Sequence, residues 1–216
     1  MEYKIAIVYT GMPVKLVSMI ESALTKQFEG DKLTFLSLSD PSIIADAVKN
    51  GSPSKEASKR LYLMYAQAVA AGADVILNAC SSVGDIAGAA QEGLRKIGVP
   101  LVRVDEMMAN EAVKNYRKIG VIATLSSTLE PTMRLIRDCA SKQNKEIELV
   151  SALADNAFGG GAEPLIEAAK KLGDAECIVL AQGSMADSEQ AVSEAMERKV
   201  YSSPYWGAKG VFEVVK

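Results

Sequence analysis

Short apolar runs alternate along the chain with longer segments whose apolar residues recur at helical spacing. Residues 4–9 form the first run, and Leu16, Ile20, Leu24 and Phe28 follow at every fourth position. The first pattern predicts a strand, and the second predicts a helix with one buried face. The alternation continues with a strand at 32–38, a helix from Pro41 capped by Asp40, a helix from Ser54 to about Ala71, a strand at 74–78, a helix at about 83–97 and a strand at 100–104.

A second, similar series follows. It comprises a strand at 117–123, a helix at 130–142, a strand at 145–150, a turn at 159–161, a helix at 162–172, a strand at 176–181 and a helix to about Arg198. The two series match in detail, because 4–10 parallels 118–124 and 75–82 parallels 177–184. Each pair joins an apolar strand to a polar strand end.

Strands that alternate with helices predict an α/β fold with parallel sheets. We therefore expect two similar doubly wound lobes, related by a pseudo-two-fold repeat, with the active site in the cleft between them. The first lobe is expected at 1–104 and the second at 105–201. Residues 202–216 are expected to pack back onto the first lobe.

Composition narrows the functional class. The 216 residues are 49% hydrophobic, with 24 basic and 27 acidic side chains and no basic block, so nucleic-acid binding has little support. No apolar run is long enough for a membrane span, and the N-terminus lacks the features of a signal peptide. Three cysteines without a close pair indicate a reduced, cytoplasmic protein.

The chain contains no histidine. This excludes a Ser-His-Asp triad, a Cys-His dyad and a histidine-ligated zinc site. No glycine-rich phosphate loop with the required spacing is present either. Acid–base chemistry must therefore use cysteine, hydroxyl, lysine or carboxylate groups.

Cys80 is the strongest candidate for such chemistry. It lies in Asn78-Ala79-Cys80-Ser81-Ser82, directly after a predicted strand and before a predicted helix. Ligands of α/β sheets bind at this edge, where helix N–H groups favour an anion and make a thiol easier to ionise. The alternatives are that Cys80 is a small buried hydrophobe and that Ser81 and Ser82 only cap the helix.

These residues resemble the aspartate/glutamate racemase superfamily, which includes hydantoin racemases, maleate isomerases and arylmalonate decarboxylases. The segment 78–82 is similar to the first cysteine loop of the family, and 120–128 is similar to its Gly-x-x-[GA]-Thr segment. Residues 180–185 stand where the family has Leu-Gly-Cys-x-x-Met, and Ser203-Pro204 resembles its late pocket segment. The resemblance spans the whole chain.

The resemblance implies a cofactor-independent, metal-free enzyme in which cysteines exchange a proton beside a carboxylate. Cys80 would be the thiolate, acting on an amino acid or dicarboxylate, and the protein would be a homodimer. The substrate-binding residues that it implies are Thr10, Asn78, Ser81, Ser82, Thr124, Ser127, Thr128, Gly183 and Ser184.

Gln182 stands where the family has its second cysteine. Glutamine forms hydrogen bonds but does not exchange protons near neutral pH. Cys177 is five residues away, at the opposite end of the predicted strand, too far to replace it. The alternatives to racemisation are a one-cysteine lyase or decarboxylase, a maleate-isomerase-like enzyme, and a non-catalytic carboxylate-binding protein.

Overall fold

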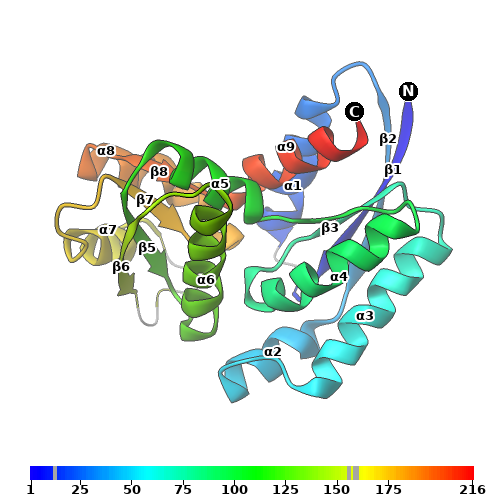
Figure 1. Cartoon of the computed structure of the whole chain (residues 1–216), viewed down its shortest axis with the longest axis horizontal. Helices are drawn as coiled ribbons and strands as arrows, with labels where there is room; N and C mark the ends of the chain where they lie inside the picture. Colours follow the sequence, from blue (N-terminus) through cyan, green and yellow to red (C-terminus); the bar gives the residue numbers. More distant parts are fainter. Residues whose placement is uncertain (12–13, 155–156, 158–160) are drawn as a thin grey trace.

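The chain forms two α/β lobes side by side, with the last helix extending from one to the other (Figure 1). The computed structural model describes residues 1–11, 14–154, 157 and 161–216. Each lobe contains a four-stranded parallel sheet, with strand order β2-β1-β3-β4 in the first and β6-β5-β7-β8 in the second. The predicted fold class is confirmed.

The first lobe follows the predicted order closely. Its elements are β1 (Glu2–Tyr9), α1 (Val14–Gln27), β2 (Lys32–Ser39), α2 (Pro41–Asn50), α3 (Lys55–Ala70), β3 (Val75–Asn78), the 3₁₀ turn η1 (Ser81–Val83), α4 (Gly84–Lys96) and β4 (Leu101–Arg103). Both predicted caps are present: the Asp40 side chain accepts the Ser42 N–H, and the Ser54 hydroxyl accepts the Ala57 N–H.

The second lobe repeats the design. Its elements are α5 (Glu106–Asn115), β5 (Lys118–Ala123), α6 (Ser126–Lys142), β6 (Glu148–Leu153), α7 (Glu163–Lys170), β7 (Cys177–Leu180), the 3₁₀ turn η2 (Gly183–Ser188), α8 (Glu189–Met196) and β8 (Lys199–Tyr201). The helix α9 (Ser203–Val215) follows β8. The glycine turn predicted at 159–161 lies largely outside the described residues.

The register of the strands gives the internal repeat a structural basis. Ile5 pairs with Val75 in the first lobe, and Ile119 pairs with Cys177 in the second. These are the positions that the sequence repeat aligns. Cys80 lies five residues after Val75, and Gln182 lies five residues after Cys177. The two residues therefore occupy equivalent places at the ends of equivalent strands.

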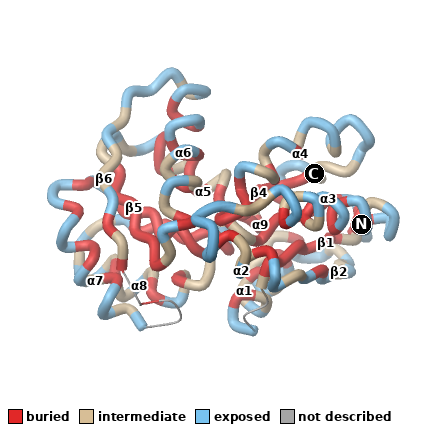
Figure 2. Tube along the Cα trace, turned by 90° about the horizontal axis from the view of Figure 1, so that it is seen from below, coloured by how far each residue is buried: buried red, intermediate tan, exposed pale blue. Residues whose placement is uncertain are grey.

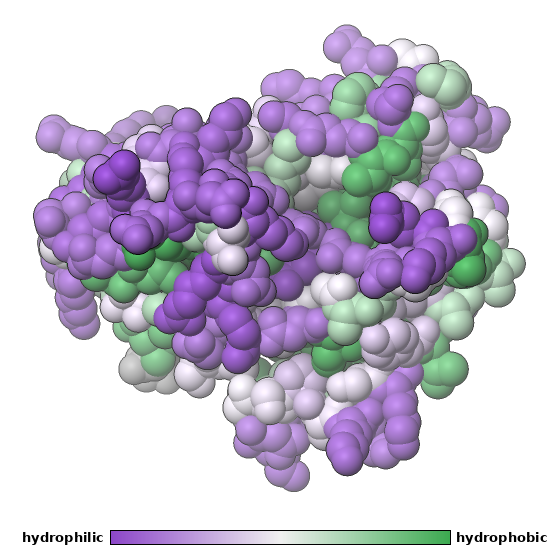
Figure 3. All heavy atoms as spheres, viewed as in Figure 1, coloured by the Kyte–Doolittle hydropathy of each residue, from purple (hydrophilic) through white to green (hydrophobic). Residues whose placement is uncertain are grey.

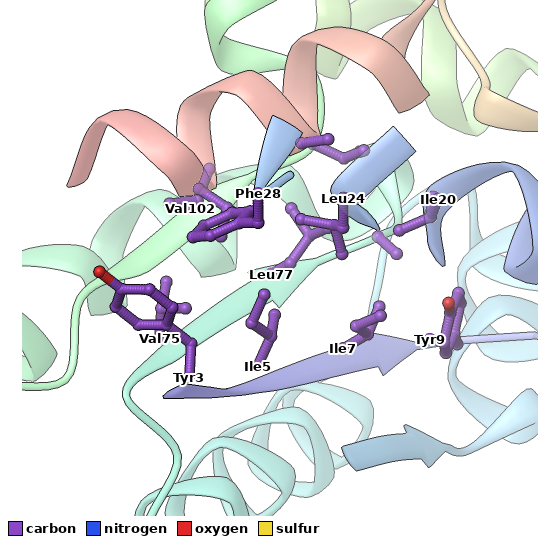
Figure 4. Packing of buried hydrophobic residues seen from close by; sticks show 14 of the residues in the cluster. Tyr3, Ile5, Ile7, Tyr9, Ile20, Leu24, Phe28, Val75, Leu77 and Val102 are labelled. Atoms are coloured by element: carbon purple, nitrogen blue, oxygen red, sulfur yellow. The ribbon is translucent and has the colours of Figure 1, made fainter. Parts of the chain in front are cut away.

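Alternating side chains of β1 form the core of the first lobe on one face of its sheet. Ile5 and Ile7 point toward Leu24 and Ile20 of α1, as Figure 4 shows. Each fully buried aliphatic side chain contributes about 1.5–3 kcal/mol of transfer free energy. The central strands β1, β3, β5 and β7 are among the most buried parts of the two lobes, whereas the edge strands β2 and β6 and the outer helix faces are more exposed (Figure 2).

The helix α9 lies beside α1 on the same face of the first sheet and covers the part of it that α1 leaves open. Its residues Ala208 and Val211 belong to the same core as Ile5 and Leu77. Gly207 permits this close approach, because a Cβ there would lie 2.7 Å from Val104 Cγ2. In the second lobe α5 covers the corresponding face, with Met108 packed among the residues of β5 and β7.

Four local predictions were wrong or missing. The helix α5 and the strand β8 were not predicted, because α5 presents mainly small alanines to the core and β8 is only three residues long. The helix α6 begins at Ser126 instead of Glu130, so Pro131 lies inside it. The strand β6 begins at Glu148 instead of Lys145, since its pairing with Lys118 of β5 sets the register.

The outer surface is largely hydrophilic on the face seen in Figure 3, and hydrophobic surface gathers in the region between α9 and α4. None of the helices in the described part of the chain combines the length and the apolarity needed to cross a lipid bilayer.

Candidate active site

A small cavity lies where the carboxyl ends of β1, β3, β5 and β7 meet between the lobes. Its volume is about 100 Å³. The described residues that line it are Thr10, Gly11, Leu16, Ile44, Ala79, Cys80, Ser81, Ser82, Leu125, Gln182, Gly183 and Ser184. Larger hollows of about 920 and 690 Å³ lie along α1 and between α4, α5 and α9, away from these strand ends. Because Cys80, Gln182 and several hydroxyl side chains line the small cavity, we take it as the candidate active site, although it is not the largest.

A hydrogen-bonded chain fixes the backbone of Cys80. The Tyr65 hydroxyl on α3 donates to Asn78 Oδ1 at 2.9 Å, and Asn78 Nδ2 donates to the carbonyl of Cys80 at 2.9 Å. Both Asn78 and Tyr65 are buried. The predicted binding residue Asn78 thus lies beneath the cavity, where it positions the cysteine instead of lining the wall.

The environment of the Cys80 sulfur combines burial with hydrogen-bond donors. Burial raises the pKa of the thiol above its usual value. The Thr10 hydroxyl, the backbone N–H groups of Ser82 and Val83, and the Ser82 hydroxyl act in the opposite direction. The sequence led us to expect a thiol that ionises more easily, but desolvation by burial outweighs these donors, so the pKa of the Cys80 thiol lies above its usual value.

Gln182 is held by Thr124, which was predicted to bind substrate. The Thr124 N–H donates to Gln182 Oε1 at 2.7 Å, and Gln182 Nε2 donates to Thr124 Oγ1 at 2.8 Å. A backbone N–H can only donate, so it fixes which end of the amide is the oxygen. The second proton on Nε2 remains as a donor. Gln182 also lines the cavity.

The other predicted hydroxyls take different places. Ser82 Oγ and Thr128 Oγ1 are 2.8 Å apart and connect the two lobes. The Oγ atoms of Ser81 and Ser127 are buried and have no hydrogen-bond partner among the described residues. Ser81 lines the cavity, so its hydroxyl is available to a ligand there.

The cavity gathers seven of the predicted residues: Thr10, Cys80, Ser81, Ser82, Gln182, Gly183 and Ser184. Asn78, Thr124 and Thr128 instead support those residues through hydrogen bonds. Sequence reasoning missed the apolar wall of Leu16, Ile44 and Leu125. Leu125 directly follows the predicted binding residue Thr124, so its place in the sequence could have identified it as a cavity residue. Leu16 and Ile44 lie on helices, where an apolar residue signals only a core position.

Cys139 on α6 and Cys177 at the start of β7 are buried away from the cavity. Burial raises the pKa of each thiol to about 12. In the described part of the chain, no group of three or more histidine, cysteine or acidic side chains is placed to hold a metal ion.

The fold and the cavity define a two-lobed α/β protein with a cysteine-containing site between matched strand ends. The family model of the Asp/Glu/Hydantoin racemases matches residues 14–209. The chain belongs to this family.

Solved structures with the same fold include racemases and an isomerase, all distant in sequence. A glutamate racemase from Francisella tularensis, in complex with D-glutamate, has a TM-score of 0.73 and 14% identity, over 99% of this chain and 81% of that one. Allantoin racemase from Klebsiella pneumoniae has a TM-score of 0.70 and 17% identity, over 99% and 87%. A maleate isomerase from Pseudomonas putida S16, solved with maleate, has a TM-score of 0.65 and 12% identity, over 100% and 92%. A search of curated proteins finds no match.

Proposed function

We propose that this protein is a cofactor-independent enzyme that acts on a small carboxylic acid and exchanges a proton at one face of the carbon beside the carboxylate. One observation carries the proposal: Cys80 and Gln182 occupy equivalent strand ends on one cavity, and only Cys80 can titrate. The Thr124 contacts hold the Gln182 amide in place. Among the described residues that line the cavity, Cys80 is therefore the one acid–base group.

The carboxylate would be bound by donors that otherwise lack partners. The buried Ser81 hydroxyl has no partner within the described ranges of the chain, and it is at the start of η1, which leads into α4. The first turn of α6 begins at Ser126, next to Leu125 in the cavity wall. Backbone N–H groups at helix starts favour an anion, and such fixed donors also stabilise charge that develops on the carboxylate oxygens.

The proton transfer follows from this arrangement. The Cys80 thiolate removes the proton from the carbon, and the electron pair of the C–H bond moves into the carboxylate to give an enediolate. The Cys80 S–H then exchanges its proton with solvent, and the thiol returns a solvent-derived proton to the same face. Gln182 contributes a hydrogen bond from Nε2 but no proton. Because burial raises the pKa of the Cys80 thiol, we expect the rate to rise with pH until that pKa is reached.

Isotope exchange tests this proposal. Single enantiomers of small chiral carboxylic acids are incubated in D₂O, the α-proton signal is followed by NMR, and the enantiomer ratio is measured by chiral chromatography. We expect exchange of the α-proton with retention of configuration. Cys80→Ser should abolish the exchange, whereas the control Cys139→Ala should retain it. Racemisation by the unmodified protein, or exchange that survives Cys80→Ser, would contradict the proposal.

The variant Gln182→Cys sharpens the test. It places a second thiol at the position equivalent to Cys80. We expect this variant to convert exchange with retention into racemisation, since a proton then becomes available from the opposite face. Retention in Gln182→Cys would show that the two positions do not face the same carbon.

A carbon–carbon cleaving reaction is the second candidate, and the raised pKa of Cys80 favours it. In such a reaction carbon dioxide leaves first, and a protonated thiol then donates its proton to the resulting carbanion. The release of carbon dioxide from a malonate-type acid would distinguish this reaction from proton exchange.

A further inference from the structure

The walls of the cavity differ in chemistry. One part carries Cys80, the hydroxyls of Thr10 and Ser81, and the amide of Gln182. The apolar part of the lining consists of Leu16, Ile44 and Leu125, which come from α1, α2 and the end of β5. A bound molecule would therefore contact both polar donors and apolar side chains.

Two of the apolar residues pack against glycines of the loops that line the cavity, one of them across the cleft. A Cβ at Gly183 would lie 2.8 Å from Leu16 Cδ1, so Leu16 of the first lobe packs directly against the second. A Cβ at Gly11 would lie 3.7 Å from Ile44 Cγ2. Both leucine and isoleucine thus contact the backbone of loops that line the cavity.

None of the described residues lining this cavity is charged. Residues 12–13, 155–156 and 158–160, outside the description, contain no lysine or arginine. Two ion pairs connect the lobes nearby: Lys15 with Asp187 at 3.1 Å and Arg134 with Asp85 at 3.0 Å. These cations do not line the cavity, and each already has an acidic partner.

The size of the cavity limits the substrate as well. A volume of about 100 Å³ is small for a ligand site. Drug-sized ligands occupy pockets of about 300–1,000 Å³. The site has room for a carboxylate and a few further carbon atoms.

We propose that the cleft selects a small carboxylic acid with one negative charge and a short apolar substituent, and that it rejects dicarboxylates. The inference rests on the proposed function, in which the polar wall binds the first carboxylate. A second carboxylate would then lie against Leu16, Ile44 and Leu125. A charge buried without a partner is costly, because it loses its hydration and gains no compensating contact. The same preference counts against decarboxylation of a malonate-type acid as the activity of this site.

A matched pair of ligands tests the inference. Isobutyrate and methylmalonate differ only by replacement of a methyl group with a carboxylate. Each is titrated as a protectant of Cys80 against a small aromatic disulfide reagent, with Cys80→Ser as the blank. We expect isobutyrate to protect at a concentration at least about tenfold lower than methylmalonate. A smaller ratio, a preference for methylmalonate, or release of carbon dioxide from methylmalonate overturns the inference. None of these outcomes contradicts the proposed chemistry with one thiol. Protection by neither acid overturns the inference together with the proposed carboxylate site.

A variant supplies the missing charge. Leu125→Lys introduces an ammonium group into the apolar wall and should reduce the isobutyrate preference at least tenfold, or reverse it. Leu63→Lys on α3, where Leu63 is 68% exposed and lies outside the cavity, is the matched control and should retain the preference. Circular dichroism checks that both variants fold. If Leu125→Lys does not fold, Leu125→Ser replaces it and should reduce the preference by admitting water to the apolar wall. An unchanged preference in the folded Leu125 variant contradicts the inference.

Discussion

The hydroxyl of Thr10 is the donor to Cys80 whose removal should be most informative. Thr10→Val keeps the shape of this buried side chain and deletes one hydrogen bond to the sulfur. A hydrogen bond to a charged group contributes about 1.5–3 kcal/mol, and one pKa unit corresponds to about 1.4 kcal/mol. We take the lower end, because donors from Ser82 and Val83 remain. Thr10→Val should therefore raise the pKa of Cys80 further, by about one unit.

This shift has a calculable effect on reactivity. Below the pKa, a rise of about one unit lowers the thiolate fraction about tenfold. A thiolate of higher pKa is also a better nucleophile, with a Brønsted coefficient of about 0.4–0.5, which restores a factor of about three. The rate of disulfide exchange at a fixed pH near neutrality should therefore fall only about threefold, whereas the midpoint of the pH profile should move by the full unit.

The assay is the pH dependence of the reaction of Cys80 with a small aromatic disulfide, with Cys80→Ser as the blank. The sequence repeat offers a matched control, since Thr124 is the counterpart of Thr10 and bonds to Gln182 instead of Cys80. Thr124→Val makes the same chemical change in the other lobe and should leave the profile in place. An unmoved midpoint in Thr10→Val, or equal shifts in both variants, would refute the assignment of Thr10 as a donor to the thiolate.

The remaining predictions concern stability. Asp105→Ala should lower the free energy of unfolding by about 3–5 kcal/mol, because it leaves the buried guanidinium of Arg103 without its two contacts at 3.0 and 3.1 Å. Urea unfolding checks this change. Replacement of both residues together, with leucine and methionine, should recover most of the loss. Gly207→Ala should lower the free energy of unfolding by about 1–3 kcal/mol, since its Cβ would lie 3.0 Å from the backbone of the first lobe. Gly93→Ala in α4, with open space around it, should raise the melting temperature. Thermal melts of the two variants should therefore show changes in melting temperature of opposite sign. Burial raises the pKa of Cys177 to about 12, so above about pH 8.5 the unfolded chain releases a proton that the folded chain keeps, and the free energy of unfolding falls as pH rises. By pH 10 this contribution amounts to about 2 kcal/mol, and urea unfolding of Cys177→Ala at pH 7 and pH 10 should lack it.

Local patterns in the sequence determined most of the fold. The helical spacing of Leu16, Ile20 and Leu24 predicted the buried face of α1, and the side chains of Asp40 and Ser54 predicted the starts of α2 and α3. These features act over a few residues, so they are readable along the chain. The strand β8 and the helix α5 were missed because their stability comes from packing on distant partners instead of from a strong local pattern.

The sequence also determined which groups could do chemistry, because it lacks histidine and places Cys80 and Gln182 in equivalent strand ends. Only the tertiary structure decided how those groups behave. Burial of Cys80 depends on both lobes, and it raises a pKa that the local donors alone would lower. The apolar wall brings together Leu16, Ile44 and Leu125 from separate elements. Desolvation and cavity shape depend on residues that are far apart in the chain. The fold therefore determines them, and a local sequence pattern does not.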